Sequence, residues 1–106
     1  LGKIFGCCLT IAGQRFIYIN SDLDTPTQKM VAAHELGHAV MHREDYFFFN
    51  WMNDTTYRSR AEIEAHTFAA ELLVPDSVVL EHPGFTLNQL SALTGYAEEF
   101  LKFKRV

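Results

Sequence analysis

The sequence contains few cysteines, no long apolar run and no excess of basic residues. Its only cysteines among 106 residues, Cys7 and Cys8, are adjacent, so on a strand they would point to opposite faces. We therefore expect no disulfide between them and a reduced, cytoplasmic setting. No apolar stretch approaches the roughly 20 residues that a membrane-spanning helix needs. The net charge of −4 argues against a nucleic-acid surface, which normally carries a basic stripe.

Internal repeats and low-complexity tracts are also absent, and the length favours one domain over residues 1–106. Hydrophobic residues make up 48% and charged residues 21% of the chain, a balance that is typical of soluble globular proteins. The first residue is Leu1 rather than Met, which is compatible with a fragment or a trimmed form of a longer chain.

A β-hairpin is predicted at the start of the chain. Residues 3–11 and 15–20 have high β propensity, and residues 12–14 are expected to form the turn between them. The hairpin has two interpretations that the sequence leaves open. It is either purely structural, or one of its strands is an edge that pairs with an extended substrate.

The helix after the hairpin has a clear predicted start. Thr25 fits the N-cap, Pro26 fits the first helical position, and Gln28 would complete a capping box. We expect this helix to extend to about Arg43.

An aromatic segment follows, at residues 46–57, within the least regular stretch of the chain, residues 43–60. Its pattern is neither helical nor strictly alternating. We expect some of these aromatic side chains to fill the core, and the others to line a substrate cleft, contact a partner protein or cover the site as a lid.

Three further helical stretches are predicted toward the C-terminus. Residues 61–74 form the second long helix, which Pro75 ends, and Asp76 is expected to cap a short turn. Residues 86–89 form a second capping box that opens one short helix, and residues 96–104 form the last. We expect these two helices to close the core. A DNA-binding helix-turn-helix is the weaker alternative, because only the last few residues are basic.

The most informative pattern is His34-Glu35-x-x-His38, inside the first helix. Residues four apart on a helix lie on one face, one turn above the other, so both imidazoles can reach one metal ion. Glu35 lies one position round the helix, where it is poorly placed to ligate but can reach a water on the metal. Zinc hydrolases combine two such nitrogen ligands, a carboxylate base and a third protein ligand from elsewhere.

The surroundings of this pattern favour a functional interpretation over a chance match. Residues 30–41 are mostly apolar, so the helix should be largely buried. Two histidines and a glutamate are costly in such a place unless something satisfies them, and a metal would do so. Gly37 costs about 1 kcal/mol relative to Ala inside a helix, which predicts that something packs closely there.

Glu62, in the second long helix, is the predicted third ligand. At roughly 100° per residue, Glu62 falls on the border of the apolar face of this helix, whereas Glu64 falls on the solvated side. His66 lies one turn after Glu62 and is the substitute candidate. The alternative without a metal is that Glu62 is a first-turn glutamate favoured by the helix dipole.

Other ligand sets fit the sequence less well. A metzincin would require glycine and histidine where Met41 and Glu44 stand. His42 continues the column of histidines, but three histidines spaced four apart on one straight helix diverge too far to share an ion. We expect His42 beside a ligand or at the surface. Cys7 and Cys8 are not favoured as ligands, because no second cysteine pair follows them.

Two segments of the chain resemble the ImmA/IrrE family of metallopeptidases. They are residues 34–42 (HELGHAVMH) and residues 62–75 (EIEAHTFAAELLVP), of which the second is the more specific. The hairpin also precedes the first helix as in the family, so the resemblance covers most of the chain. It implies an α+β fold of the zincin type. In that fold a small antiparallel sheet packs on the first helix and a second ligand-bearing helix, with short C-terminal helices.

The resemblance also implies a site and an activity. Zn²⁺ would be held by His34, His38 and Glu62, with Glu35 as the catalytic base. The protein would be a cytoplasmic protease that cleaves a DNA-binding transcriptional repressor, in a family often encoded by phages or mobile elements. The candidates for an oxyanion donor or for a residue that supports a ligand are Tyr57, His66, His42 and Tyr46.

A non-catalytic protein of the same fold is the main alternative. In that case the metal is structural or the chain regulates a partner by contact, and the aromatic segment is its best support. An open coordination position favours the enzyme, whereas a fourth protein ligand that closes the site favours the structural role.

Overall fold

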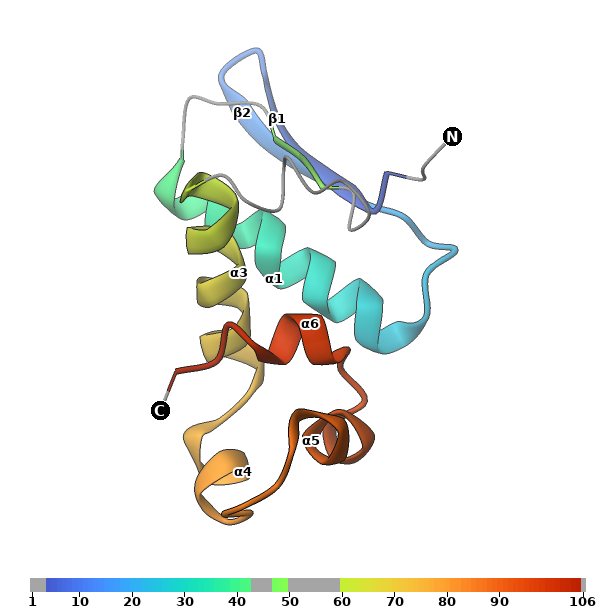
Figure 1. Ribbon diagram of the computed structural model, residues 1–106. Coiled ribbons are helices and arrows are strands. Elements are labelled where there is room, and N and C mark those ends of the chain that lie inside the picture. The colour runs from blue at the N-terminus through green and yellow to red at the C-terminus, as the bar shows by residue number, and fades with distance from the viewer. Residues whose placement is uncertain (1–3, 43–46, 50–59, 106) are drawn as a thin grey trace.

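The hairpin predicted from the sequence is present. The computed structural model (Figure 1) describes residues 4–42, 47–49 and 60–105. Strand β1 (Gly6–Ile11) pairs antiparallel with β2 (Gln14–Ile19) without interruption. Ala12 and Gly13 join them with φ angles of 51° and 80°. Two consecutive positive φ values are what a two-residue type I′ turn requires, and this turn matches the twist of the strands.

A third strand, β3 (Phe47–Phe49), was not predicted from the sequence. It pairs antiparallel with β1, with Phe49 opposite Gly6 and Phe47 opposite Cys8, so the sheet order is β2-β1-β3. Three consecutive phenylalanines show no alternation, and only the pairing with β1 identifies them as a strand. The rest of the aromatic segment lies outside the described residues.

The first helix, α1 (Thr25–Met41), is capped one residue earlier than predicted. Asp24, not Thr25, is the N-cap, and its carboxylate accepts the backbone N–H of Thr27 at 2.9 Å. The side chain of Gln28 donates to a backbone carbonyl of the preceding loop at 2.7 Å instead of closing a capping box. With Asp24 as the N-cap, Pro26 stands at the second helical position instead of the first. Proline lacks an N–H, and this is tolerated there because the first four N–H groups of a helix have no intrahelical partner.

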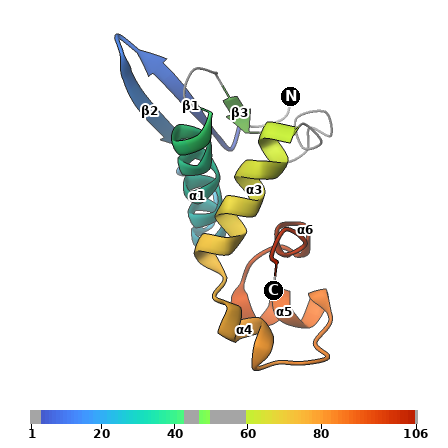
Figure 2. The same cartoon turned by 90° about the vertical axis from the view of Figure 1, so that its left-hand side faces the viewer.

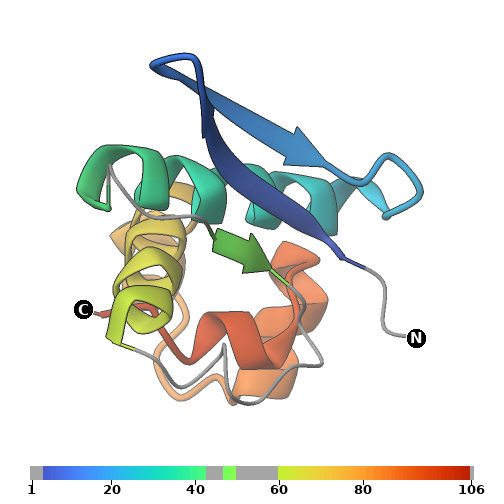
Figure 3. The same cartoon turned by 90° about the horizontal axis from the view of Figure 1, so that it is seen from above.

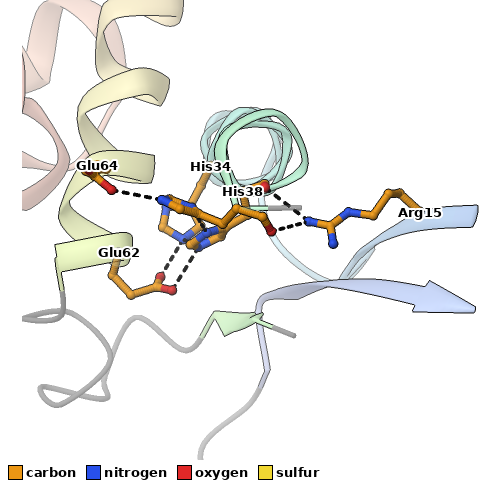
Figure 4. Close-up of polar contacts among 6 residues, drawn as sticks. Arg15, His34, His38, Glu62 and Glu64 are labelled. Atoms are coloured by element: carbon orange, nitrogen blue, oxygen red, sulfur yellow. Dashed lines mark hydrogen bonds and ion pairs between the residues drawn. The ribbon is translucent and has the colours of Figure 1, made fainter. Parts of the chain in front are cut away.

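The end of α1 is tied to the hairpin. The helix ends at Met41 rather than near Arg43, and His42 is the C-cap, with its N–H donated to the carbonyl of His38 at 2.8 Å. The Arg15 guanidinium, from β2, donates to the carbonyls of His38 at 3.1 Å and His42 at 2.8 Å (Figure 4). The His38 carbonyl thereby accepts a second hydrogen bond beside that from the N–H of His42, and the His42 carbonyl, just past the last helical residue, gains a partner from β2.

The second long helix, α3 (Arg60–Leu73), packs against α1, and Figure 2 shows the two side by side. Gly37 lies at this contact. A Cβ at Gly37 would be 3.2 Å from the ring of Phe68 and 3.3 Å from the Cα of Ala65. The close packing that the sequence predicts at Gly37 is therefore confirmed, and the absent side chain lets α3 approach.

Enlarging Gly37 should destabilise the fold. In Gly37→Leu the new side chain would meet the backbone of α3, and overpacking of this kind typically costs about 1–3 kcal/mol. The measurement is urea unfolding followed by circular dichroism. As a control, Leu36→Val changes a side chain on the exposed side of the same helix, and should alter the free energy of unfolding by less than about 0.5 kcal/mol. Equal stability of the parent and Gly37→Leu would contradict the close packing.

Three short helices complete the chain: α4 (Asp76–Leu80), α5 (Leu87–Thr94) and α6 (Glu98–Leu101). The capping box predicted at the start of α5 is confirmed in both directions. The backbone N–H of Gln89 donates to Oγ1 of Thr86 at 3.2 Å, and the N–H of Thr86 donates to Oε1 of Gln89 at 2.9 Å.

The last helix is shorter than predicted, because the chain after it turns back onto α3. Lys104 Nζ lies 3.0 Å from the Glu71 carboxylate, and the backbone N–H of Arg105 donates to the same carboxylate at 2.7 Å. These contacts depend on where α3 lies, so local sequence does not reveal them.

The core lies between α1, α3 and α6, and Figure 3 shows the hairpin on the other side of α1. Its buried members are Met30, Val31, Ala33, Ala69, Ala70, Val74, Phe100 and Leu101. The α+β arrangement expected from the sequence is confirmed: a small antiparallel sheet, two long helices and short C-terminal helices. No helix within the described residues is long and apolar enough to span a bilayer.

Candidate metal centre

His34 and His38 lie one helical turn apart on α1, and both are fully buried. Their Nε2 atoms are 3.2 Å apart. The helical spacing alone brings these two nitrogens together, as the sequence predicts. Either one nitrogen donates to the other, or both offer their lone pairs to one ion together with a third group.

Glu62, in the first turn of α3, supplies that group. Its Oε1 is 2.8 Å from Nε2 of His34, and its Oε2 is 2.9 Å from Nε2 of His38 (Figure 4). Glu62 is only 2% exposed, whereas the side chain of Glu64, two residues later, is 44% exposed. The structure thus places Glu62, and not Glu64, at the two histidines.

The donor atoms of His34, His38 and Glu62 are spaced as a single small cation requires. Oε1 of Glu62 is 2.8 Å from His34, Oε2 is 2.9 Å from His38, and the two histidine nitrogens are 3.2 Å apart. Ligands 2.0–2.1 Å from a tetrahedral ion lie about 3.3 Å from one another, so a small outward shift of the Glu62 carboxylate would seat an ion among them. Two imidazole nitrogens and one carboxylate also form a donor set that suits zinc. The residues present therefore fit a metal ion.

The protonation states of these groups also suit a cation. Burial would raise the pKa of Glu62, but the hydrogen bonds from His34 and His38 outweigh it and lower that pKa to about 2. Burial is the main reason that the pKa of His34 is lowered. A metal ligand must be a carboxylate or a neutral imidazole, so the ionised Glu62 and the burial of His34 suit a metal, and the protons that the two histidines donate to Glu62 would leave as the metal binds.

Glu35 lies next to these ligands without joining them. It is fully buried, and neither carboxyl oxygen has a hydrogen-bond partner within the described part of the chain. Burial, and secondarily the charge of Glu62, raises the pKa of Glu35 to about 8. A buried carboxyl group without a partner is expensive to keep, and such groups occur where a substrate or a water is to be bound.

Comparison with known proteins places this site in a family. A peptidase family model, described as the IrrE N-terminal-like domain, matches residues 6–103. The chain belongs to this family. The resemblance to the ImmA/IrrE metallopeptidases drawn from the sequence is thereby confirmed, and membership supports a function of the metallopeptidase type.

The chain is also similar to a phage protein. It is 38% identical over 94 residues to "Uncharacterized immunity region protein 2" of Bacillus phage phi105. The match covers 85% of this chain and 58% of the phage protein, so the chain spans little more than half the length of that relative. No solved structure matches the chain.

His66, the substitute candidate ligand of this IrrE-like domain, packs against the His34 ring. It is fully buried, its ring centroid is 4.2 Å from that of His34, and it stacks on Phe103 at 4.7 Å. Burial is the largest cause of the lowering of its pKa to about 3. His66 therefore stays neutral and supports one face of the His34 ring.

His42 touches the site from the end of α1. Its Nδ1 is 2.9 Å from Nδ1 of His38, and its Nε2 is 2.9 Å from Oε1 of Glu64. The sequence placed His42 beside a ligand or at the surface, but it did not show the link to Glu64. That link depends on how α1 and α3 cross. The other two candidates, Tyr46 and Tyr57, lie outside the described residues.

The two cysteines, on β1, are buried free thiols. The pKa of both Cys7 and Cys8 is raised, mainly by burial and further by the negative charge of Glu35. A raised pKa keeps a thiol protonated, whereas a metal ligand must be a thiolate.

Proposed function

We propose that this domain is a zinc-dependent metallopeptidase that hydrolyses peptide bonds of a protein substrate. His34, His38 and Glu62 are the proposed zinc ligands, and Glu35 is the proposed general base. The observation that carries the proposal is the convergence of two imidazoles and one carboxylate from α1 and α3, at 2.8–3.2 Å. Beside them lies the buried carboxyl group of Glu35, for which the described residues offer no hydrogen-bond partner.

The proposed roles follow from the positions of the side chains. When bound, zinc would polarise the scissile carbonyl and lower the pKa of a water to about 7. Glu35 takes the proton of the attacking water and returns it to the leaving nitrogen, so it acts first as base and then as acid. The burial of Glu35 and the three ligands keeps other solvent away from this proton transfer. The proposed candidates for the oxyanion donor are Tyr57, His66, His42 and Tyr46.

The proposed substrate is a DNA-binding transcriptional repressor. Support comes from the name of the phage relative, which assigns that protein to an immunity region. An immunity region is a regulatory setting, which favours a regulator such as a transcriptional repressor as the substrate. The cytoplasmic setting and the single-domain organisation over residues 1–106 stay predictions that accompany this proposal.

One experiment tests the proposed function as a whole. The purified chain is analysed for metals and then incubated with a purified DNA-binding transcriptional repressor as the candidate substrate. We expect about one zinc per chain and a small number of defined fragments, because a specific peptidase recognises few bonds. Cleavage should stop when a chelator removes the metal. A metal-free preparation that still cleaves, or a zinc-loaded one that leaves the repressor intact, would contradict the proposal.

A further inference from the structure

A line of hydrogen-bonding side chains runs from the buried site to the surface at the end of α1. His38 is fully buried, the side chain of His42 is 13% exposed, and that of Glu64 is 44% exposed. Both contacts along this line, His38 to His42 and His42 to Glu64, measure 2.9 Å between heavy atoms. The three side chains come from two helices, so the line also joins α1 to α3.

One arrangement of protons satisfies both contacts and leaves His38 able to bind a metal. A ligand nitrogen carries no proton, so a neutral His38 that binds through Nε2 carries its proton on Nδ1. That N–H donates to Nδ1 of His42, which must then be the acceptor. His42 in turn carries its proton on Nε2 and donates it to the carboxylate of Glu64.

We propose that His42 and Glu64 form a histidine relay, which holds the His38 ring so that Nε2 faces the metal. The proposal rests on the proposed function, because it takes His38 to be a ligand. His42 and Glu64 are positioning residues that act through His38. Metal-binding histidines generally donate their other N–H to an acceptor, which fixes the tautomer and makes the ligand nitrogen more basic.

The position of Glu64 explains why a second histidine is needed. Glu64 lies on the solvated side of α3, so its carboxylate reaches His42 and not His38. His42 bridges the gap, and Arg15 holds the backbone of this turn by binding the carbonyls of both His38 and His42. His42 is the third histidine of the column and lies too far along the helix to share the ion. In this proposal it positions His38 instead of binding the metal.

The affinity of the full chain for zinc tests the relay. In a competition titration against a chromophoric chelator, His42→Ala should bind zinc about 10- to 100-fold more weakly, the usual loss for such an outer partner. His42→Asn keeps an amide oxygen near the position of Nδ1, so it should recover most of that loss. Glu64→Gln keeps an acceptor but removes the charge, and should fall between the parent and His42→Ala.

Matched controls separate the relay from general effects on stability. His82→Ala removes another partly buried histidine, whose Nδ1 lies 2.7 Å from the carbonyl of Val78, away from the site. Glu99→Gln removes an exposed carboxylate that pairs with Lys102. Both should bind zinc as the parent does. Far-ultraviolet circular dichroism shows whether each variant is folded.

A spectroscopic signature distinguishes a relay from mere packing. Long-range ¹H–¹⁵N spectra of the zinc-loaded chain should show His38 protonated on Nδ1 and His42 protonated on Nε2. In His42→Asn the His38 signal should keep this pattern. A zinc-loaded chain with the proton of His42 on Nδ1 would overturn the relay, as would equal zinc affinity in His42→Ala and the parent.

The outcomes also distinguish the two proposals. A chain that binds no zinc would end the proposed function, and the relay with it. A chain that binds zinc and cleaves its substrate, but whose affinity is indifferent to His42 and Glu64, would end the relay alone.

Discussion

Replacing Glu35 with glutamine should stop cleavage without removing the metal. Proton transfer by a positioned side chain typically contributes about 10²–10⁴-fold to a rate, and an amide cannot take the proton. Glu35→Gln should therefore lose at least this factor in the cleavage rate. Its zinc affinity should stay within a few-fold of the parent, because Glu35 lies beside the ligands and is not one of them.

The structure also predicts that this variant folds. Glutamine has nearly the shape of glutamate, and the uncharged side chain is easier to bury in the place where Glu35 has no partner among the described residues. The measurements are initial rates of substrate cleavage, zinc titration and circular dichroism. Glu99→Gln, an exposed carboxylate-to-amide change, is the control and should retain full activity.

Two outcomes would count against Glu35 as the base. Cleavage at the parental rate by zinc-loaded Glu35→Gln would show that another group takes the proton. Full biological effect without any cleavage would favour the alternative expected from the sequence, a non-catalytic module that regulates its partner by contact.

The second large effect is expected from replacing Glu62 with glutamine, which should prevent zinc from binding. Glu62→Gln replaces the only proposed ligand that carries a negative charge with a poor donor. Zinc affinity should fall by more than the roughly 10- to 100-fold that the loss of an outer hydrogen bond costs. Cleavage should fall with it at zinc concentrations that saturate the parent.

A control on the same helix separates the ligand from its surroundings. Glu71 is also on α3 but is exposed and pairs with Lys104, so Glu71→Gln should bind zinc normally. The measurement is the same competition titration used for the relay. If Glu62→Gln binds zinc as tightly as the parent, the third ligand is another residue. His66, one turn away and packed on His34, would then be the first to test.

The sequence predicted those parts of the fold and site that depend on local signals. The spacing of His34 and His38 sets their common face, and Pro75 ends the second long helix where expected. The phase of that helix was enough to separate the buried Glu62 from the exposed Glu64. Each of these follows from 3.6 residues per turn or from the chemistry of one residue.

The missed features depend on contacts between distant segments. The strand Phe47–Phe49 exists through its pairing with β1, and the short last helix reflects the return of Lys104 to Glu71. The link between His42 and Glu64 depends on the crossing of α1 and α3, which the sequence does not give. The N-cap at Asp24 is a different kind of error, because two adjacent residues could both cap.

X-ray absorption at the zinc edge of the zinc-loaded chain tests the central claim most directly. The claim is that two imidazoles and one carboxylate hold the ion and leave one position open. It predicts nitrogen and oxygen neighbours at about 2.0–2.2 Å, imidazole scattering from two rings, and no sulfur. A neighbour at about 2.3 Å, the zinc–sulfur distance, would mean that Cys7 or Cys8 binds the metal. Three imidazoles would mean that another histidine takes the place of Glu62, and four would mean a closed histidine site. Any of these results would contradict the account.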